Sequence, residues 1–478
     1  MTAFTAIADD LTGAADTAVE FRHLGPAYVM VSPFPQGGLP EAGVYGALAV
    51  HTASRNLPPE LMRFAVGTAY KLLSYLPRML TYMKVDSNLR GNIGLQLAAA
   101  LEAGLGPFAL LCPAFPARRR TVSGGVCRVD GVPVAETEMG RDPVSPVPES
   151  HAAKLVSAQL EEEVGLVGLA QLRAGLRTLK KSLLCQVEAG RRVIVADAET
   201  NQDLRRLARA ALSMKRAPSL PESLPTNLEV KPSPAQTAEA LEQYTRGILR
   251  TLAALLSYEG CPLLAGSAGL AREVAALVGL KPKASSAPRA KRARLAGGPR
   301  RKGPVLVAVG SASQVSAAQV CYLAEHTTAA VIGVPRPSPF VELPKQSPSA
   351  RQAQRAARAG QHAVLTLAPP DTSIENLSIG PDPGPETMGI VARRSLGLAV
   401  PFVGMVISGG DTACEVLCRL RARAVRLMDS LEPGVAAGRL VGGFRDGLPV
   451  VLKAGAAGGQ ECLARAIAWV QSQGEGRE

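Results

Sequence analysis

The chain has 478 residues, more than one hydrophobic core usually supports, so we expect at least two domains. With 47% hydrophobic and 4% aromatic residues, no run of about 18 apolar residues and no Cys-x-x-Cys pair among eight cysteines, its composition is typical of an α/β protein and argues against a membrane span or a zinc module. The net charge of +13 does not indicate nucleic-acid binding, because nine basic residues and no acidic one lie within 281–304, where no aromatic residue is available to stack on a base.

The first half alternates short apolar runs with turns and helical patterns, which predicts βα units around a mainly parallel sheet. The N-terminus opens directly into a strand-like run without a leader pattern, so we expect a cytoplasmic protein. We predict strands at 3–8, 45–50, 80–85, 108–112 and 192–196, and helices at 14–24, 91–104 and 201–213. The interval 113–150 is rich in Pro, Gly and Arg, and we predict a long functional or covering loop there.

An acidic pair, Asp9 and Asp10, follows the first predicted strand and precedes a helix. In open α/β sheets ligands collect at the carboxyl ends of strands, so these carboxylates lie where chemistry is usually placed. Asp10 or Thr12 could equally cap the helix by accepting a backbone N–H. The pair alone therefore leaves both roles open.

A denser polar segment runs from Lys84 to Asn92, between another predicted strand and a helix. It offers two cations, a carboxylate and neutral hydrogen-bonding side chains, the mixture that a polyhydroxy carboxylate needs for binding. Arg55, just beyond another predicted strand, could add a planar fork for a carboxylate. An ordinary solvated turn could contain the same residue types, so the segment by itself only suggests a sugar-acid site.

The strand and helix rhythm resumes at Val305, after the basic stretch. We therefore predict an N-terminal domain at 1–280, a linker at 281–304 and a C-terminal domain at 305–478. Three predicted strands of the C-terminal domain end in small-residue turns that contain glycine, and glycine lets backbone N–H groups approach phosphate oxygens closely. No turn matches the Walker A pattern, and each alone could serve tight packing, but together they predict a nucleotide site.

These motifs, in this order, resemble those of the four-carbon acid sugar kinase family, whose first half binds the sugar acid and whose second half binds the nucleotide. The resemblance rests on Ala8-Asp9-Asp10-Leu11-Thr12-Gly13, on Lys84 to Asn92, on Cys112-Pro113-Ala114-Phe115-Pro116 and on the glycine turns. It implies substrate contacts at Asp10, Arg55, Lys84, Asp86, Ser87, Asn88 and Arg90. It implies ATP contacts at Ser311, Gly409, Gly410, Asp411, Thr412 and Gly455. The chain departs from the family at Asn88, Gln96 and Arg118-Arg119, where Thr, Glu and Gln-Gly are usual.

The resemblance predicts an α/β fold of two domains, each built on a mainly parallel sheet flanked by helices, with the active site in the cleft between them. The predicted reaction is ATP-dependent phosphorylation, with Mg²⁺, of the terminal hydroxyl of a tetronate or oxo-tetronate, giving the 4-phosphate and ADP. Asp10 is our first choice for the base and Asp86 the second; the Mg²⁺ ligands and the oligomeric state, a homo-oligomer included, stay open. The expected partners are the small sugar acid and ATP, without nucleic acid or membrane. The alternatives are an NAD(P)-dependent oxidoreductase of a small hydroxy acid and a non-catalytic binding relative.

Overall fold

The computed structural model describes residues 2–31, 45–74, 76, 78–142, 145–214, 261–278, 303–311, 313–334, 347–367, 385–397 and 401–473. In the first half the strands and α-helices are β1 (Thr2–Ala8), α1 (Leu11–Ala18), β2 (Ala27–Met30), β3 (Ala47–His51), α2 (Pro59–Ser74), β4 (Arg78–Lys84), α3 (Ile93–Glu102), β5 (Ala109–Cys112), β6 (Arg120–Ser123), β7 (Val126–Val129), β8 (Val132–Pro133), α4 (Ala152–Leu160), β9 (Gly165–Val167), α5 (Leu169–Arg173), α6 (Leu176–Glu188), β10 (Val193–Ala196), α7 (Asn201–Leu212), β11 (Leu263–Gly266) and α9 (Ala268–Val278). The short 3-10 helices are η1 (Val19–Leu24), η2 (Pro116–Arg118), η3 (Val134–Glu136) and η4 (Glu138–Arg141). The second half contains β12 (Val305–Val309), α10 (Gln314–His326), β13 (Ala329–Gly333), α11 (Pro348–Arg358), β14 (His362–Thr366), α12 (Pro385–Ser395), β15 (Gly404–Ser408), α13 (Gly410–Arg419), β16 (Ala424–Glu432), β17 (Val435–Val441), β18 (Pro449–Lys453) and α14 (Cys462–Ser472).

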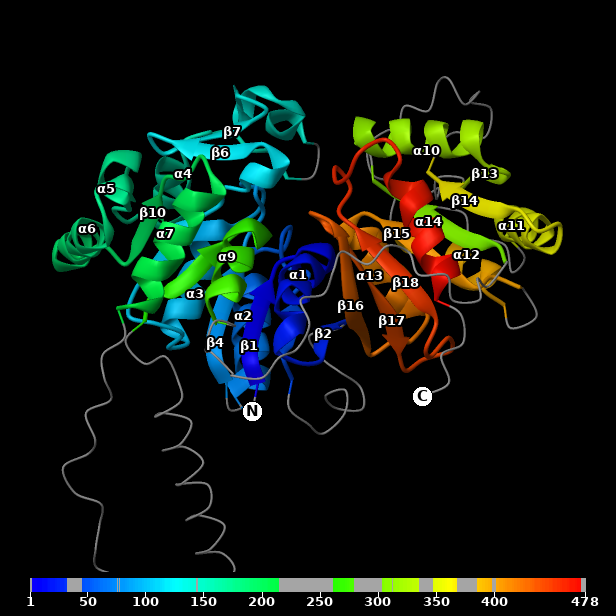
Figure 1. Ribbon diagram of the computed structural model, residues 1–478, viewed down its shortest axis with the longest axis horizontal. Helices are drawn as coiled ribbons and strands as arrows, with labels where there is room; N and C mark the ends of the chain where they lie inside the picture. Colours follow the sequence, from blue (N-terminus) through cyan, green and yellow to red (C-terminus); the bar gives the residue numbers. More distant parts are fainter. Residues whose placement is uncertain are drawn as a thin grey trace, which may run out of the picture.

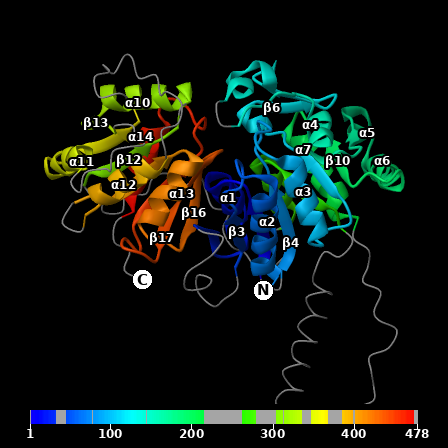
Figure 2. The ribbon, with the colours of Figure 1, turned by 180° about the vertical axis from the view of Figure 1, so that it is seen from behind.

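One sheet of 15 strands runs through both halves of the protein, in the order β13-β14-β12-β15-β18-β17-β16-β2-β3-β1-β4-β11-β5-β10-β9. Its pairs are parallel except for the three that involve β16 or β17. The halves form two lobes side by side, and β2 of the first lobe meets β16 of the second at the centre (Figures 1 and 2). The predicted α/β fold with mainly parallel sheets is confirmed, and the two sheets prove to be continuous.

The composition of the strands explains why the sheet is covered by helices. Every residue of β3, β12 and β18 is buried, and these strands consist almost entirely of aliphatic residues. A parallel strand needs a crossover connection, usually a helix, and the helices then cover both faces of the sheet. The carboxyl ends of the parallel strands in each lobe consequently lie at one edge of the sheet, next to loops that lead into helices.

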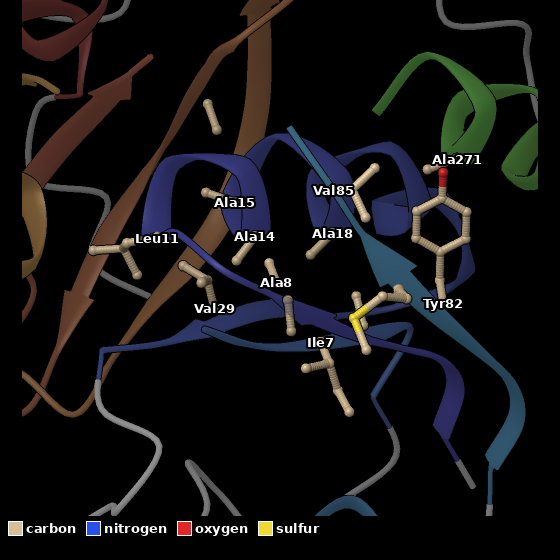
Figure 3. Close-up of a cluster of buried hydrophobic side chains, with 14 of the residues drawn as sticks. Ile7, Ala8, Leu11, Ala14, Ala15, Ala18, Val29, Tyr82, Val85 and Ala271 are labelled. Carbon is tan, nitrogen blue, oxygen red and sulfur yellow. The ribbon is translucent and has the colours of Figure 1, made fainter. Parts of the chain in front are cut away.

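Helix α1 lies directly on the sheet because the residues that face it are small. Ala14, Ala15 and Ala18 are fully buried, and the close-up in Figure 3 shows Ala14 and Ala18 on the side of the helix that faces β1. Tyr82 of β4 extends toward Ala271 of α9 (Figure 3). Its hydroxyl donates a hydrogen bond to the backbone oxygen of Ser267 at 2.7 Å. The close packing fixes the first turn of α1, which carries the acidic pair, against the edge of the sheet.

The strands predicted for the first half are all present close to their expected bounds, and the three predicted helices are present as α1 with η1, α3 and α7. The interval 113–150, predicted as a long functional or covering loop, is not one continuous loop. This interval contains the small antiparallel sheet β6-β7-β8 and three 3-10 helices. Its strands are only two to four residues long, too short to show a hydrophobic period.

All but the last two residues of the predicted linker at 281–304 lie outside the described residues. The predicted division into domains at this linker therefore stays a prediction. None of the described helices is long and apolar enough to cross a membrane.

Candidate active site

A cleft of about 660 Å³ lies where the loops at the carboxyl ends of the strands of the two lobes meet. The first lobe contributes residues that follow β1, β3 and β4, and the second contributes residues that follow β12, β15 and β18. Every residue predicted from the sequence to contact sugar acid or nucleotide lines this one cleft: Asp10, Arg55, Lys84, Asp86, Ser87, Asn88, Arg90, Ser311, Gly409, Gly410, Asp411, Thr412 and Gly455. The structure thus brings together motifs that lie more than 400 residues apart in the chain, from Asp10 to Gly455.

Asp10 has the capping role that the sequence left open. Its carboxylate accepts hydrogen bonds from the backbone N–H of Gly13 at 3.2 Å and from the Thr12 hydroxyl at 2.7 Å. Its neighbour Asp9 accepts hydrogen bonds from both Nε and Nη2 of Arg55, at 2.7 and 3.0 Å. Capping does not exclude chemistry at Asp10, since its carboxylate still lines the cleft.

Arg55 lies between three carboxylates. Besides its paired bonds to Asp9, its Nη2 lies 3.1 Å from Asp10 Oδ1 and 3.9 Å from Asp86 Oδ1. A bidentate pair uses the planar fork of the guanidinium, so Arg55 orients the acidic side chains of the site.

Asp86 is held by the segment that it belongs to. Arg90 donates to it from Nε at 3.0 Å and from Nη2 at 3.3 Å, and the backbone N–H groups of Asn88 and Arg90 add longer bonds. Arg90 also lies 3.5 Å from Asp142, in the interval expected to be a loop. The arginine therefore joins the substrate-binding segment to the cover of the cleft.

The charges of this group decide which carboxylates are ionised. Burial raises the pKa of Asp10, but Arg55, Lys84 and the Thr12 hydroxyl outweigh it, and the pKa lies below its ordinary value. Burial acts on Asp86 in the same way, and Arg90 and Arg55 hold its pKa far below the ordinary value. Both carboxylates are thus ionised at neutral pH, in a cleft also lined by cations.

Among the described cations of the cleft that are buried or half-buried, two are not engaged by carboxylates. Lys84 is buried and donates to the carbonyl oxygen of Val85 at 2.7 Å, and Arg118 donates to that of Ala456 at 2.8 Å. Neither forms an ion pair in the part of the chain that the structure describes, whereas Arg55 and Arg90 both do. Lys84 and Arg118 are therefore the cations of this group that are available to anionic ligands.

The glycines of the second lobe allow close approaches that a side chain would block. Gly409 has φ +112°, which favours glycine, and it caps α13. A Cβ at Gly310 would lie 1.9 Å from the Thr412 hydroxyl, and one at Gly455 would lie 2.2 Å from the Ser311 hydroxyl. The starts of α10 and α13 border the same cleft, and helix starts carry partial positive charge and free N–H groups. These loops can therefore hold phosphate groups.

Asp10 touches the second lobe at one of these loops. A Cβ at Gly410 would lie 2.6 Å from Asp10 Oδ2, so only glycine permits the approach of the two lobes seen here. The carboxylate of the first motif thus borders the first residue of α13. A group bound by the glycine loops and a group bound beside Asp10 would be neighbours.

Lys453 connects the glycine loops through hydrogen bonds. It was missing from the sequence-based prediction of the site. It is fully buried, and its ammonium donates to the hydroxyls of Ser408 at 3.0 Å and Ser316 at 3.4 Å and to the carbonyl oxygens of Ala454 and Gly455. Its position directly after the aliphatic run of β18 is the sequence signal that could have revealed it, because a lysine in a buried strand needs polar partners.

Asp16, Arg118 and four residues of η3 and η4 also line the cleft and were likewise not predicted as contacts; the four are Glu136, Glu138, Met139 and Arg141. Asp16 accepts a hydrogen bond from the N–H of Gly434 in the second lobe at 2.8 Å. Asp16 was missed because nothing in the sequence of its helix, which consists mainly of small residues, distinguishes it from a surface carboxylate. The other residues were missed because the interval 113–150 shows neither a helical nor a strand period. The polar composition of that interval was the available signal.

Comparisons with known proteins agree with this division of the cleft. Residues 4–221 match the family model of a sugar-binding N-terminal domain, and residues 306–463 match that of a nucleotide-binding C-terminal domain. A D-threonate kinase of Bordetella bronchiseptica is 32% identical over 465 residues, which cover 96% of this chain and 95% of the relative. A D-erythronate kinase of Heliobacterium modesticaldum is 28% identical over 483 residues, with 96% and 95% covered.

Two solved structures share the fold. A Salmonella typhimurium protein aligns with a TM-score of 0.66 at 19% identity, covering 97% of this chain and 98% of its own. A Haemophilus influenzae protein aligns with a TM-score of 0.63 at 21% identity, covering 98% and 100%. The relatives named above are kinases, which does not favour the oxidoreductase alternative. The chain belongs to the four-carbon acid sugar kinase family and is a carbohydrate kinase.

Proposed function

We propose that the protein transfers the γ-phosphoryl group of ATP to the terminal hydroxyl of a four-carbon sugar acid, giving the 4-phosphate and ADP. The observation that carries this proposal is the contact between Asp10 and Gly410. It joins the carboxylate of the sugar-side motif to the start of α13 on the nucleotide side. Phosphoryl transfer requires this neighbourhood, because the acceptor hydroxyl and the γ-phosphate must be held in line with each other.

The sugar acid is assigned to the first lobe. Lys84 is a buried cation without a carboxylate partner in the described residues, so we assign the carboxylate of the substrate to it. Ser87 and Asn88 line the same wall and offer polar groups to the hydroxyls. Arg55 and Arg90 hold Asp10 and Asp86 in place and contribute positive charge around them.

The nucleotide is assigned to the loops of the second lobe. Ser311, Gly409 to Thr412 and Gly455 border the cleft, and glycines at these turns leave room for phosphate oxygens to approach the backbone. Mg²⁺ bound through phosphates usually needs only one or two protein carboxylates. The described residues contain no cluster of three or more metal-binding side chains, but Asp411 in the first turn of α13 lines the cleft and fits that smaller requirement. When bound, Mg²⁺ would neutralise phosphate charge.

In the proposed mechanism Asp10 accepts the proton of the attacking hydroxyl. The new bond forms between the hydroxyl oxygen and the γ-phosphorus, the bond from that phosphorus to the bridging oxygen breaks, and ADP leaves. The lowered pKa of Asp10 keeps its carboxylate ionised, and therefore unprotonated, at neutral pH. Asp86 is the second choice, because Arg90 and Arg55 hold its pKa far below the ordinary value and so make it the weaker base.

The test is ADP release by the purified protein with a panel of four-carbon sugar acids, with and without Mg²⁺. We expect Mg²⁺-dependent release with at least one tetronate or oxo-tetronate. Asp10→Asn should lower that turnover roughly 10²- to 10⁴-fold while ATP binding stays nearly unchanged, because asparagine still caps α1. Unchanged turnover in Asp10→Asn would remove Asp10 from the role of base, and no release with any acid would contradict the proposed substrate class.

A further inference from the structure

Arg118 extends from the first lobe to the nucleotide loop of the second. It ends η2, yet its Nη2 donates a hydrogen bond to the carbonyl oxygen of Ala456 at 2.8 Å. Its Nη1 lies near Gly434, where a Cβ would be 3.1 Å away. The side chain also lines the cleft, so it lies between the loops assigned to the nucleotide and the acidic side chains assigned to the sugar side.

The guanidinium of Arg118 forms few polar contacts with the described part of the protein. Its one side-chain hydrogen bond in the described structure goes to Ala456, and it forms no ion pair with a described residue. An arginine has five N–H donors and stays charged in proteins, so most of its donors have no protein acceptor here. Burial lowers the pKa of Arg118, with the more distant charges of Asp16, Asp86 and Asp10 opposing that effect.

Arg118 is half-buried, and a cation that loses part of its hydration without gaining an anionic partner destabilises a fold. Arg55 and Arg90 find compensation in protein carboxylates, whereas Arg118 has one neutral carbonyl and the Phe115 ring, whose centroid lies 6.0 Å away. The missing partner is an anion that enters the cleft. Between glycine loops and Asp10, the anion that fits this place is a phosphoryl group.

We propose that Arg118 is a catalytic residue that contacts the γ-phosphoryl group while it passes from the nucleotide to the sugar acid. The proposal rests on the proposed function and adds to it a residue that distinguishes this chain, because Gln is usual in the family at the position of Arg118. Arg118 donates hydrogen bonds to the non-bridging oxygens of the phosphoryl group, keeps all its protons, and stabilises negative charge as the new bond forms and the old one breaks. Its bond to Ala456 forms only across the two lobes, so this charge is in place when the lobes are close together.

The neighbouring Arg119 provides a matched control. It is exposed and paired with Asp130 at the surface, and it does not line the cleft. Arg118→Gln and Arg119→Gln remove the same charge one residue apart. The affinities of both variants for ATP and for ADP should be measured without sugar acid, and then kcat with the best acceptor.

We expect Arg118→Gln to weaken ATP binding about tenfold relative to ADP and to lower kcat roughly 10²-fold or more, because only ATP carries the γ-phosphate. Arg119→Gln should match the wild type in each measurement. Arg118→Lys, which keeps a charge but not the fork, should give intermediate values and serves if the glutamine variant does not fold. Equal loss of ATP and ADP affinity, or an unchanged kcat, would overturn the proposal by reducing Arg118 to a structural link.

The experiments distinguish failure of the proposed function from failure of the proposed role of Arg118. If the wild type released no ADP with any tetronate, the proposed function would fail, whereas the ATP-against-ADP comparison would still test Arg118. If the wild type is an active tetronate kinase and Arg118→Gln retains its kcat, only the role of Arg118 is wrong.

Discussion

A single buried carboxylate, Asp16, is poised differently from the rest of the site. Burial raises its pKa to about 6, although Arg118 and the N–H of Gly434 act in the opposite direction. Asp10 and Asp86, by contrast, are held ionised by cations within hydrogen-bonding distance. The site therefore contains one carboxylate of intermediate acidity in addition to two strongly acidic ones. The charged form of Asp16 is unfavourable in this buried position and lowers the stability of the fold.

The pH dependence of stability should reveal that cost. Because the folded pKa of Asp16 is raised above 3.8, the folded state binds more protons than the unfolded state between about pH 4 and about pH 6, so stability falls as pH rises through this range. Asp16→Asn removes the titration and keeps an acceptor for Gly434. Above about pH 6 the variant should be more stable by up to about 3 kcal/mol, and below about pH 4 the difference should vanish.

Thermal unfolding at a series of pH values measures this difference. Asp130→Asn is the control, because Asp130 is an exposed carboxylate whose left-handed backbone also suits asparagine. The control should show the pH dependence of the wild type. An Asp16→Asn variant that is less stable than the wild type at neutral pH would show that the charged form of Asp16 is favoured by the fold.

At the scale of elements, the three glycine loops act as one unit because Lys453 binds all of them. Its partners belong to the end of β15, the first turn of α10 and the loop after β18. The pKa of Lys453 is lowered to about 8, mainly by burial; Arg118 also lowers it, whereas Cys462 and Glu432 raise it. The ammonium thus lies beneath the loops assigned to phosphate, where its charge would favour an anion.

Nucleotide affinity should follow the protonation of Lys453. As pH rises from about 7 to about 9 the free enzyme loses this proton, so the KM for ATP should rise while the KM for the sugar acid changes little. Lys453→Met should raise the KM for ATP at neutral pH about tenfold, or about 1.4 kcal/mol, and abolish the further rise. A variant whose KM for ATP still climbs over this range would assign the titration to another group.

The elements that could be predicted from the sequence are those with a strong local signal. Buried parallel strands such as β1 and β12 are mostly apolar runs, and the turns after them carry polar and glycine residues that line the cleft. The residues that were missed depend on tertiary contacts. Arg118 follows a proline in a segment without period, and its partner Ala456 lies 338 residues away, so no local pattern could connect them.

At the scale of the whole molecule, the continuous sheet couples the folding of the two lobes. Residues Ala27 to Met30 of β2 pair with Leu427 to Ala424 of β16, in antiparallel register. Across the same boundary, Asp10 borders Gly410, Asp16 binds Gly434 and Arg118 binds Ala456. The sequence predicted two sheets, because edge-to-edge pairing of distant strands leaves no mark on the local pattern of either.

Unfolding can test whether this junction couples the lobes, because the single tryptophan, Trp469, is buried in α14 of the second lobe. In the wild type, unfolding followed by Trp469 fluorescence and by far-ultraviolet circular dichroism should coincide. Val29→Asp places a charge in a fully buried position of β2, opposite Val425, and should destabilise the first lobe and its pairing with β16 by several kcal/mol. Circular dichroism should then show an early transition that Trp469 fluorescence does not report.

Met428→Asp is the matched control, because Met428 lies in β16 just beyond the paired stretch and its side chain is exposed. It introduces the same side chain into the same region without entering the junction, so its two unfolding curves should still coincide. If the curves of Val29→Asp also coincide, the lobes remain one cooperative unit without an intact β2–β16 ladder. The contacts across the cleft, rather than the sheet, would then hold them together.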